Sequence, residues 1–243
     1  MRLFFLKSTL PYALIFIVQP KFNFEAIESI ADNNAAYNLL DAVADSLALN
    51  SYAVIDNFLS DQESLDCLEI LKENKEQGTF KKAGIGTSNQ YQINRSIRGD
   101  EIKWLDESNL SAANQVYMDQ INAMMRFFNR SLFLSLKDFE CHFAHYPTGT
   151  FYKRHLDLLK LSDHRVLSFV FYLNPNWQQG DGGELLLYLS ENDVEKTVVV
   201  NPLLGRLVIF RSELLEHEVA LAHKSRYSIT GWMLSQFKGT TFL

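Results

Sequence analysis

The chain has 243 residues, of which 47% are hydrophobic and 21% are charged, and its formal net charge is −6 at pH 7. This composition is ordinary for a globular protein with one core and excludes a disordered tail, a collagen and a coiled coil. No basic stripe runs through the sequence, so we expect no nucleic-acid partner.

Residues 1–20 contain an apolar run that fits a targeting segment poorly. Residues 11–18 are nearly all apolar, but Lys7 and Pro11 interrupt the run and no small-x-small cleavage site follows it. The run is also shorter than the ~20 apolar residues of a membrane span. We therefore expect no membrane association, and we favour a packed arm or an extension upstream of the true start over a secretion signal.

Helical periodicity dominates the first half of the chain. Three helices are expected, over residues 24–49, 61–76 and 111–130. The second has a capping box, because Ser60 is followed three residues later by Glu63, and it should stop at Gly78. A strand is expected between the first two helices, over residues 51–55. Residues 78–100 are polar and contain four glycines, and a long loop of this kind is often a lid.

The pattern changes to short apolar runs with a period of two from residue 138 onward. Seven strands are expected, over residues 139–146, 167–173, 184–189, 197–200, 206–210, 217–221 and 226–234. Strands at this spacing predict a sandwich or barrel, so the fold class is α+β with a mainly β core. We expect an N-terminal arm and helices over 1–50, and a second domain over 51–243 whose β core spans about 138–236.

One cluster of polar residues has the composition of a metal site. If residues 151–157 are extended, His155 and Asp157 point to the same face. His217 opens a later strand and could supply a third ligand. Two histidines and one carboxylate form the facial triad of non-haem iron(II) enzymes, with positions left open for a co-substrate and oxygen. Arg226, nine residues after His217, could hold the far carboxylate of a keto-diacid with paired hydrogen bonds.

His142 and His145 are two further candidate ligands. They lie three residues apart on an expected strand, so their side chains should point to opposite faces of the sheet. The two histidines therefore cannot both bind one metal ion.

Residues 51–234 resemble the iron(II)/2-oxoglutarate-dependent prolyl hydroxylases, specifically the hypoxia-inducible-factor branch and its bacterial relatives. The resemblance is carried in one order by residues 97–104, 146–147, 152–157, 171–174, 182–185, 217–219 and 226–232. It implies a double-stranded β-helix, a jelly-roll barrel, which agrees with the expected strands. Arg rather than Lys at position 226 favours the hypoxia-factor-like branch over the collagen-type enzymes.

The resemblance also implies a role for each site residue. The iron ligands would be His155, Asp157 and His217. The far carboxylate of 2-oxoglutarate would be held by Arg226 and Tyr172, in a pocket with Tyr146, Tyr152 and Trp232. The lid that closes over a peptide would contain Arg98, Asp100 and Arg165, with an ion pair between the last two. The turn between Tyr146 and Tyr152 is one residue shorter than in the animal enzymes.

The resemblance implies a dioxygenase that uses iron(II), 2-oxoglutarate and O2, with ascorbate in support. The expected substrate is a prolyl residue of a cytoplasmic protein, such as elongation factor Tu, on which the bacterial relatives act.

Two cysteines, Cys67 and Cys141, are too few for a disulfide framework and fit a reducing compartment. The alternatives are an oxygenase of a free small molecule such as an amino acid, a non-catalytic binding or sensing module, and a zinc hydrolase. The oligomeric state is left open.

Overall fold

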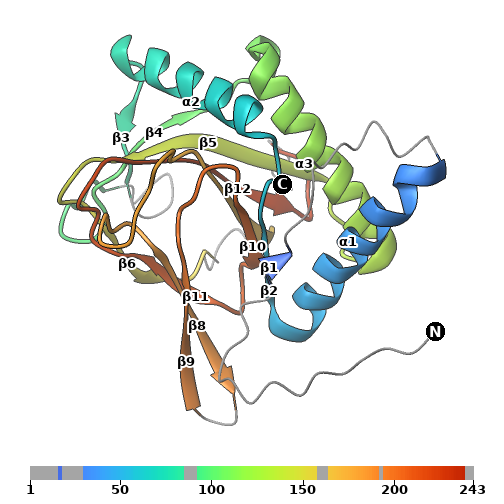
Figure 1. Cartoon of the computed structure of the whole chain (residues 1–243). Helices are drawn as coiled ribbons and strands as arrows, with labels where there is room; N and C mark the ends of the chain where they lie inside the picture. Colours follow the sequence, from blue (N-terminus) through green and yellow to red (C-terminus); the bar gives the residue numbers. More distant parts are fainter. Residues whose placement is uncertain (1–15, 18–29, 85–91, 158–163, 192–193, 239–243) are drawn as a thin grey trace, which may run out of the picture.

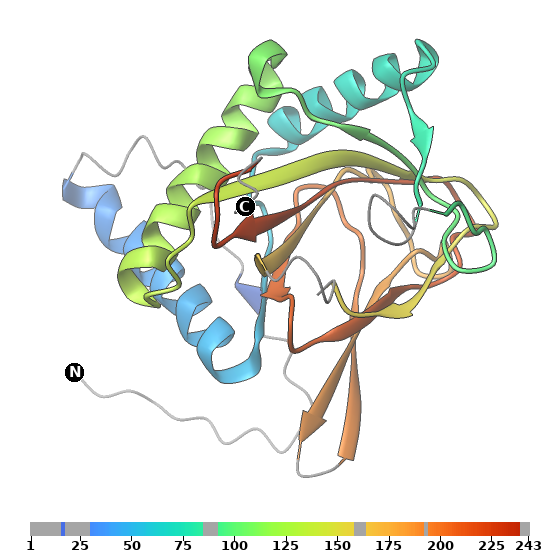
Figure 2. The same cartoon turned by 180° about the vertical axis from the view of Figure 1, so that it is seen from behind.

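Three α-helices of the described residues lie against one face of a large β-sheet in this computed structural model (Figures 1 and 2). The structure describes residues 16–17, 30–84, 92–157, 164–191 and 194–238. The helices are α1 (Ile30–Asn50), α2 (Asp61–Glu76) and α3 (Ala112–Ser131). Their predicted positions are confirmed, apart from residues 24–29 of the first expected helix, which lie outside the described residues.

The two ends of α2 follow from local chemistry. The Ser60 hydroxyl accepts a hydrogen bond from the Glu63 amide, and the Ser60 amide donates to the Glu63 carboxylate at 2.8 Å, which completes the predicted capping box. The helix ends at Glu76, and Gly78 then takes a φ of 70°, which glycine adopts without a steric penalty.

Two sheets face each other and form the β core. The larger sheet has the strand order β1 (Phe16–Ile17), β2 (Tyr52–Ile55), β10 (Leu207–Arg211), β7 (Arg165–Tyr172), β12 (Arg226–Leu234), β5 (Asp138–Tyr146), β4 (Glu101–Trp104) and β3 (Lys81–Lys82). The smaller sheet has the order β6 (Tyr152–His155), β11 (Glu216–Val219), β8 (Leu185–Glu191) and β9 (Val194–Val200). All the expected strands are present, and the short strands β1, β3, β4 and β6 are additions.

Alternation along the strands of the larger sheet divides the core into two apolar layers. On β5, Phe139 and Phe143 pack against the helices, while Ala144 and Tyr146 face the smaller sheet. The predicted opposite orientation of the two β5 histidines is confirmed. His145 stacks on Tyr227 of the helix-facing layer with ring centroids 4.8 Å apart, whereas His142 lines a cavity between the sheets.

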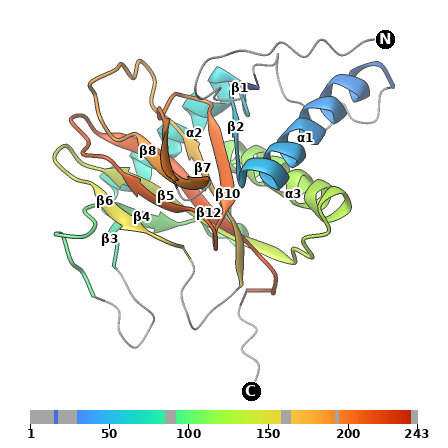
Figure 3. The same cartoon turned by 90° about the horizontal axis from the view of Figure 1, so that it is seen from below.

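Helix α1 shares its core with the β-sheet, because Val43 and Leu47 belong to the same buried cluster as Ile55 and Phe171. The boundary between residues 50 and 51 stays a prediction. Strands β3, β4 and β6 lie at the end of the molecule away from α1 (Figures 1 and 3). Among the described helices, none combines the length and apolar character needed to span a membrane.

Candidate active site

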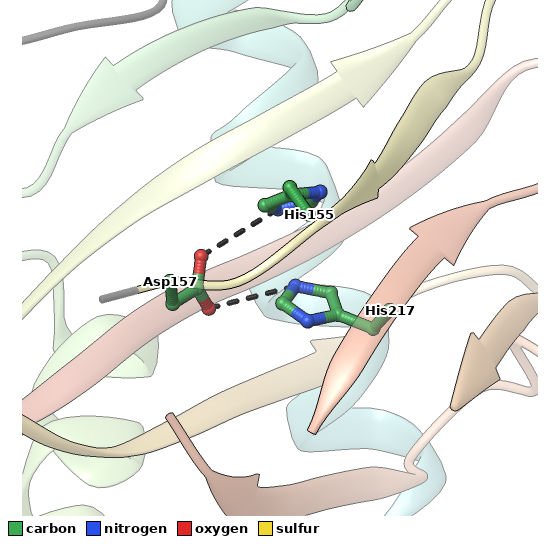
Figure 4. A group of neighbouring side chains, drawn as sticks. All are labelled: His155, Asp157 and His217. Atoms are coloured by element: carbon green, nitrogen blue, oxygen red, sulfur yellow. Dashed lines mark ion pairs between the residues drawn. The ribbon is translucent and has the colours of Figure 1, made fainter. Parts of the chain in front are cut away.

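The three predicted metal ligands come together on the smaller sheet. His155 ends β6 and is the direct register partner of His217 on the neighbouring strand β11. Asp157 follows two residues later and places its carboxylate between them (Figure 4). Its Oδ1 lies 3.6 Å from His155 Nε2, and its Oδ2 lies 3.5 Å from His217 Nε2. One ligand atom from each residue lies within 4.8 Å of the others, which is close enough to bind one ion.

Backbone carbonyls fix the tautomer of both histidines. His155 Nδ1 lies 2.7 Å from the Lys153 carbonyl oxygen, and His217 Nδ1 lies 3.2 Å from that of Leu215. A carbonyl oxygen only accepts, so each Nδ1 carries the hydrogen and donates it. The lone pair is therefore left on Nε2, the atom that faces Asp157. Outer hydrogen bonds of this kind orient histidine ligands in metal sites.

The electrostatics of Asp157 and His217 keep these two ligands in the form that binds metal. Burial alone would raise the pKa of Asp157, but His217, His155 and a hydrogen bond from Ser168 hold it well below its ordinary value. Burial lowers the pKa of His217 to about 4. A carboxylate and a neutral imidazole are therefore the states present near neutral pH, and these are the states that bind a cation.

Arg226 places a buried positive charge in the space between the two sheets, which the triad also faces. Its side chain points inward from β12 and the residue is 3% exposed. Nε donates to the Gly183 carbonyl oxygen at 2.9 Å, and Nη1 donates to Ser228 Oγ at 3.2 Å. A Cβ atom at position 183 would lie 2.9 Å from Arg226 Cδ, and the φ of 76° there also suits glycine. Among the described residues, no carboxylate forms an ion pair with Arg226.

Two tyrosines flank this guanidinium. The rings of Tyr146 and Tyr172 have their centroids 4.9 and 5.0 Å from Arg226 Cζ. The Tyr172 hydroxyl is buried without a hydrogen bond of good geometry in the described part of the chain, and burial raises the pKa of Tyr172. A buried cation without an anion, beside an unsatisfied hydroxyl, is costly unless a ligand completes it. The carboxylate of 2-oxoglutarate fits both groups.

A cavity of about 460 Å³ joins the triad to Arg226. Its volume is in the usual range for small-molecule sites. The predicted site residues on its wall are Arg98, Asp100, Tyr146, Tyr152, His155, Asp157, Arg165, His217, Arg226 and Trp232. Tyr172 is the exception, because it is fully buried, with its ring centroid 5.0 Å from Arg226 Cζ.

The predicted ion pair between Asp100 and Arg165 is wrong. Arg98 instead binds Asp100 through two bonds, with Nε–Oδ1 at 2.8 Å and Nη2–Oδ2 at 2.5 Å. Residues two apart on an extended segment share a face, which makes this local pair easy to form. Arg165 stacks over the Trp232 ring at 3.5 Å and donates to Glu140 at 2.8 Å. Residues 85–91 of the expected lid lie outside the described residues.

Several residues of the cavity wall were not predicted from the sequence. The ring of His142 packs against both Trp104 and Trp232, with centroids 4.9 and 5.5 Å away, and the two tryptophan rings lie 6.2 Å from each other. Burial lowers the pKa of His142 to about 3, so it is neutral. The alternation of side chains along a strand could have predicted these positions. His142 shares the cavity-facing side of β5 with Tyr146, and Thr230 shares that side of β12 with Trp232.

Comparisons with known proteins agree with this site. The family model described as the 2OG-Fe(II) oxygenase superfamily matches residues 141–234. A Pseudomonas putida prolyl-4-hydroxylase structure is 36% identical, covers 82% of this chain and 100% of its own, and has a TM-score of 0.72. This chain belongs to the prolyl hydroxylase family of the 2-oxoglutarate- and iron(II)-dependent oxygenases. The two facing sheets are therefore the double-stranded β-helix of that family, as the sequence predicted.

More distant relatives include further prolyl hydroxylases. A Trichoplax adhaerens prolyl hydroxylase, solved with an oxygen degradation domain peptide of hypoxia-inducible factor, is 29% identical with a TM-score of 0.76. It covers 87% of this chain and 96% of its own. Prolyl hydroxylase EGLN3 of Mus musculus is 27% identical over 74% of this chain. This chain spans 77% of that relative, but only 28% of the hypoxia-inducible factor prolyl hydroxylase of Caenorhabditis elegans.

Proposed function

We propose that this protein hydroxylates a prolyl residue in a protein or peptide, using iron(II), 2-oxoglutarate and O2. One observation carries the proposal. A His-Asp-His cluster and a buried guanidinium without an anionic partner line the same cavity in the described structure. A zinc hydrolase would have no use for a buried cation of this kind, and a non-catalytic module would have no use for three free metal positions.

The chain's own residues bind and orient the reactants. His155, Asp157 and His217 would hold iron from one side and leave the cavity side open. Arg226 would hold the far carboxylate of 2-oxoglutarate, with Tyr172 and Tyr146 beside it. When bound, these reactants supply the oxidising chemistry: 2-oxoglutarate becomes succinate and carbon dioxide, and one oxygen atom enters a substrate C–H bond. The protein contributes position and the exclusion of water.

The cavity wall favours a peptide over a free amino acid. Trp104 is 47% exposed and forms an aromatic surface with His142 and Trp232, which suits an apolar prolyl ring. A free amino acid would bring an ammonium and a carboxylate that both need partners. The charged groups of the wall nearest this surface are already paired, Arg98 with Asp100 and Arg165 with Glu140. The Trichoplax relative, which was solved with a peptide, supports the same choice.

The identity of the target is a finer proposal. A cytoplasmic protein similar to elongation factor Tu is our candidate, and ascorbate is expected to support turnover; both rest on the family resemblance alone. The test is mass spectrometry of host proteins with and without this gene product. We expect a prolyl residue that gains one oxygen atom only when the active protein is present. Oxidation of a free amino acid, with no modified protein, would replace this proposal with the small-molecule oxygenase.

A further inference from the structure

Asp157 differs from the two histidines in how it is held. His155 and His217 lie on paired strands, whereas Asp157 lies two residues beyond the end of β6, outside any strand of the described structure. Its carboxylate is instead held in place by a hydrogen bond from another side chain. Ser168, which points inward from β7, donates a hydrogen bond to Asp157 Oδ2 at 2.7 Å.

A second serine continues this contact into the core. Ser212, just after β10, places its Oγ 2.8 Å from Ser168 Oγ. Both serines are buried, with exposed fractions of 1% for Ser168 and 0% for Ser212. The Ser212 amide also donates to the Val166 carbonyl oxygen on β7 at 3.1 Å, so its position is fixed by the backbone.

Hydrogen-bond chemistry sets the direction of this chain of groups. An ionised carboxylate only accepts, so the single Ser168 proton goes to Asp157. Ser168 Oγ must then accept from Ser212, whose hydroxyl proton points toward Ser168. Successive bonds with one direction strengthen each other, and bonds to a charged acceptor are the strongest of their kind. The two hydroxyls thus form an ordered relay that ends on the carboxylate.

We propose that Ser168 and Ser212 are positioning residues that orient the Asp157 carboxylate for metal binding. This inference rests on the proposed metal centre and adds to it the groups that hold its one acidic ligand. Without the relay, the carboxylate is free to rotate about its Cβ–Cγ bond and is no longer aimed between the histidines. Outer hydrogen-bond partners of metal ligands typically change metal affinity by roughly 10- to 100-fold when they are removed.

The test is an anaerobic titration of the metal-free protein with Co²⁺, which reports affinity and an absorption spectrum sensitive to ligand geometry. Ser168→Ala should bind roughly 10- to 100-fold more weakly and change the spectrum. Ser168→Thr keeps the hydroxyl and should restore both. Ser212→Ala leaves the direct bond to Asp157 intact, so the loss should be only about two- to five-fold.

A matched control separates this effect from a general loss of packing. Ser64 on α2 is as deeply buried as Ser212, and its hydroxyl has no partner among the described residues. Ser64→Ala should therefore bind Co²⁺ as the wild type does. If Ser168→Ala does not fold, the comparison of Ser212→Ala with Ser64→Ala tests the same relay.

The outcomes distinguish the relay from the metal centre itself. Wild-type affinity and spectrum in Ser168→Ala, or in Ser212→Ala where the first variant is not folded, would overturn the relay. Asp157→Ala should lose Co²⁺ binding whichever result the serine variants give. Unchanged Co²⁺ binding in Asp157→Ala would instead overturn the proposed metal centre.

Discussion

His155 and His217 are direct register partners across the β6–β11 ladder, and each donates its Nδ1 proton to the backbone carbonyl of the residue two positions before it. The pairing of two short strands therefore sets both the separation of the imidazoles and the nitrogen that each presents. This arrangement of backbone and side chain places the two Nε2 atoms beside the Asp157 carboxylate, where they can bind one metal ion.

Replacing either histidine should remove the metal and the turnover. His155→Ala and His217→Ala each take away one of three ligands, and no spare donor lies in the cluster of the described structure. Iron-dependent decarboxylation of 2-oxoglutarate is the measurement. His223→Ala removes an exposed histidine and should leave the rate unchanged. Normal turnover in His217→Ala would remove this residue from the ligand set.

Arg226→Ala should weaken the binding of 2-oxoglutarate sharply. In this variant the buried far carboxylate of 2-oxoglutarate has no partner. The cost is about 2–5 kcal/mol of binding free energy, which is more than tenfold in affinity. Arg226→Lys should be milder but not neutral, because an ammonium lacks the planar fork. Calorimetric titration with 2-oxoglutarate checks both variants. Equal affinity in Arg226→Ala and the wild type would show that another residue holds the co-substrate.

Gly183→Ala should act through Arg226. The added Cβ would lie 2.9 Å from Arg226 Cδ and must displace the side chain, so the KM for 2-oxoglutarate should rise. Gly180→Ala is the control, because Gly180 also has a positive φ, of 97°, but a Cβ there would meet no atom within 4 Å. Steady-state kinetics of the two variants separates displacement from backbone strain. A KM that rises equally in both would point to strain alone.

Trp104→Ala should affect the peptide and spare the co-substrate. Trp104 is half-exposed beside His142 and Trp232 and does not contact Arg226 in any described interaction. We expect a higher KM for a proline-containing peptide at an unchanged KM for 2-oxoglutarate. Phe133→Ala removes an aromatic ring that is 84% exposed and should change neither value. A peptide KM that stays at the wild-type value would place the substrate on another surface.

Ser60→Ala should change stability without changing catalysis. The capping box at α2 loses its side-chain acceptor, which costs about 0.5–2 kcal/mol of unfolding free energy. Urea denaturation measures this loss. The KM for 2-oxoglutarate should stay constant, because Ser60 lies on the helical layer and outside the cavity wall. An unchanged midpoint would mean that the cap contributes little to α2.

Local chemistry explains why much of the fold could be predicted. Ser60 and Glu63 define a helix start within four residues, and alternation along β5 and β12 defines two faces. The metal ligands could be proposed because His155 and Asp157 share a face at close sequence spacing. The short strands β4 and β6 carry too few residues for a periodic signal and depend on their partners for their conformation.

The missed features depend on contacts between distant segments. The hydrogen bond from Ser168 to Asp157 requires the inward face of β7 to meet the residues after β6, which no local pattern encodes. The expected pair between Asp100 and Arg165 failed because each charge has another partner. Asp100 pairs locally with Arg98, and Arg165 pairs with Glu140 on the distant strand β5. The place of His142 in the cavity wall follows from the register of β5 with β4 and β12, which the sequence of β5 alone does not encode.

Transfer of labelled oxygen from O2 to a prolyl residue is the most direct measurement of the proposed hydroxylation. The wild-type protein and Asp157→Ala are incubated with iron(II), 2-oxoglutarate, isotopically labelled O2 and a host protein extract, and peptides are analysed by mass spectrometry. We expect one labelled oxygen atom on a prolyl residue with the wild type and none with Asp157→Ala. Consumption of 2-oxoglutarate by the wild type with labelled oxygen on a free small molecule, and on no prolyl residue, would contradict the proposed hydroxylation.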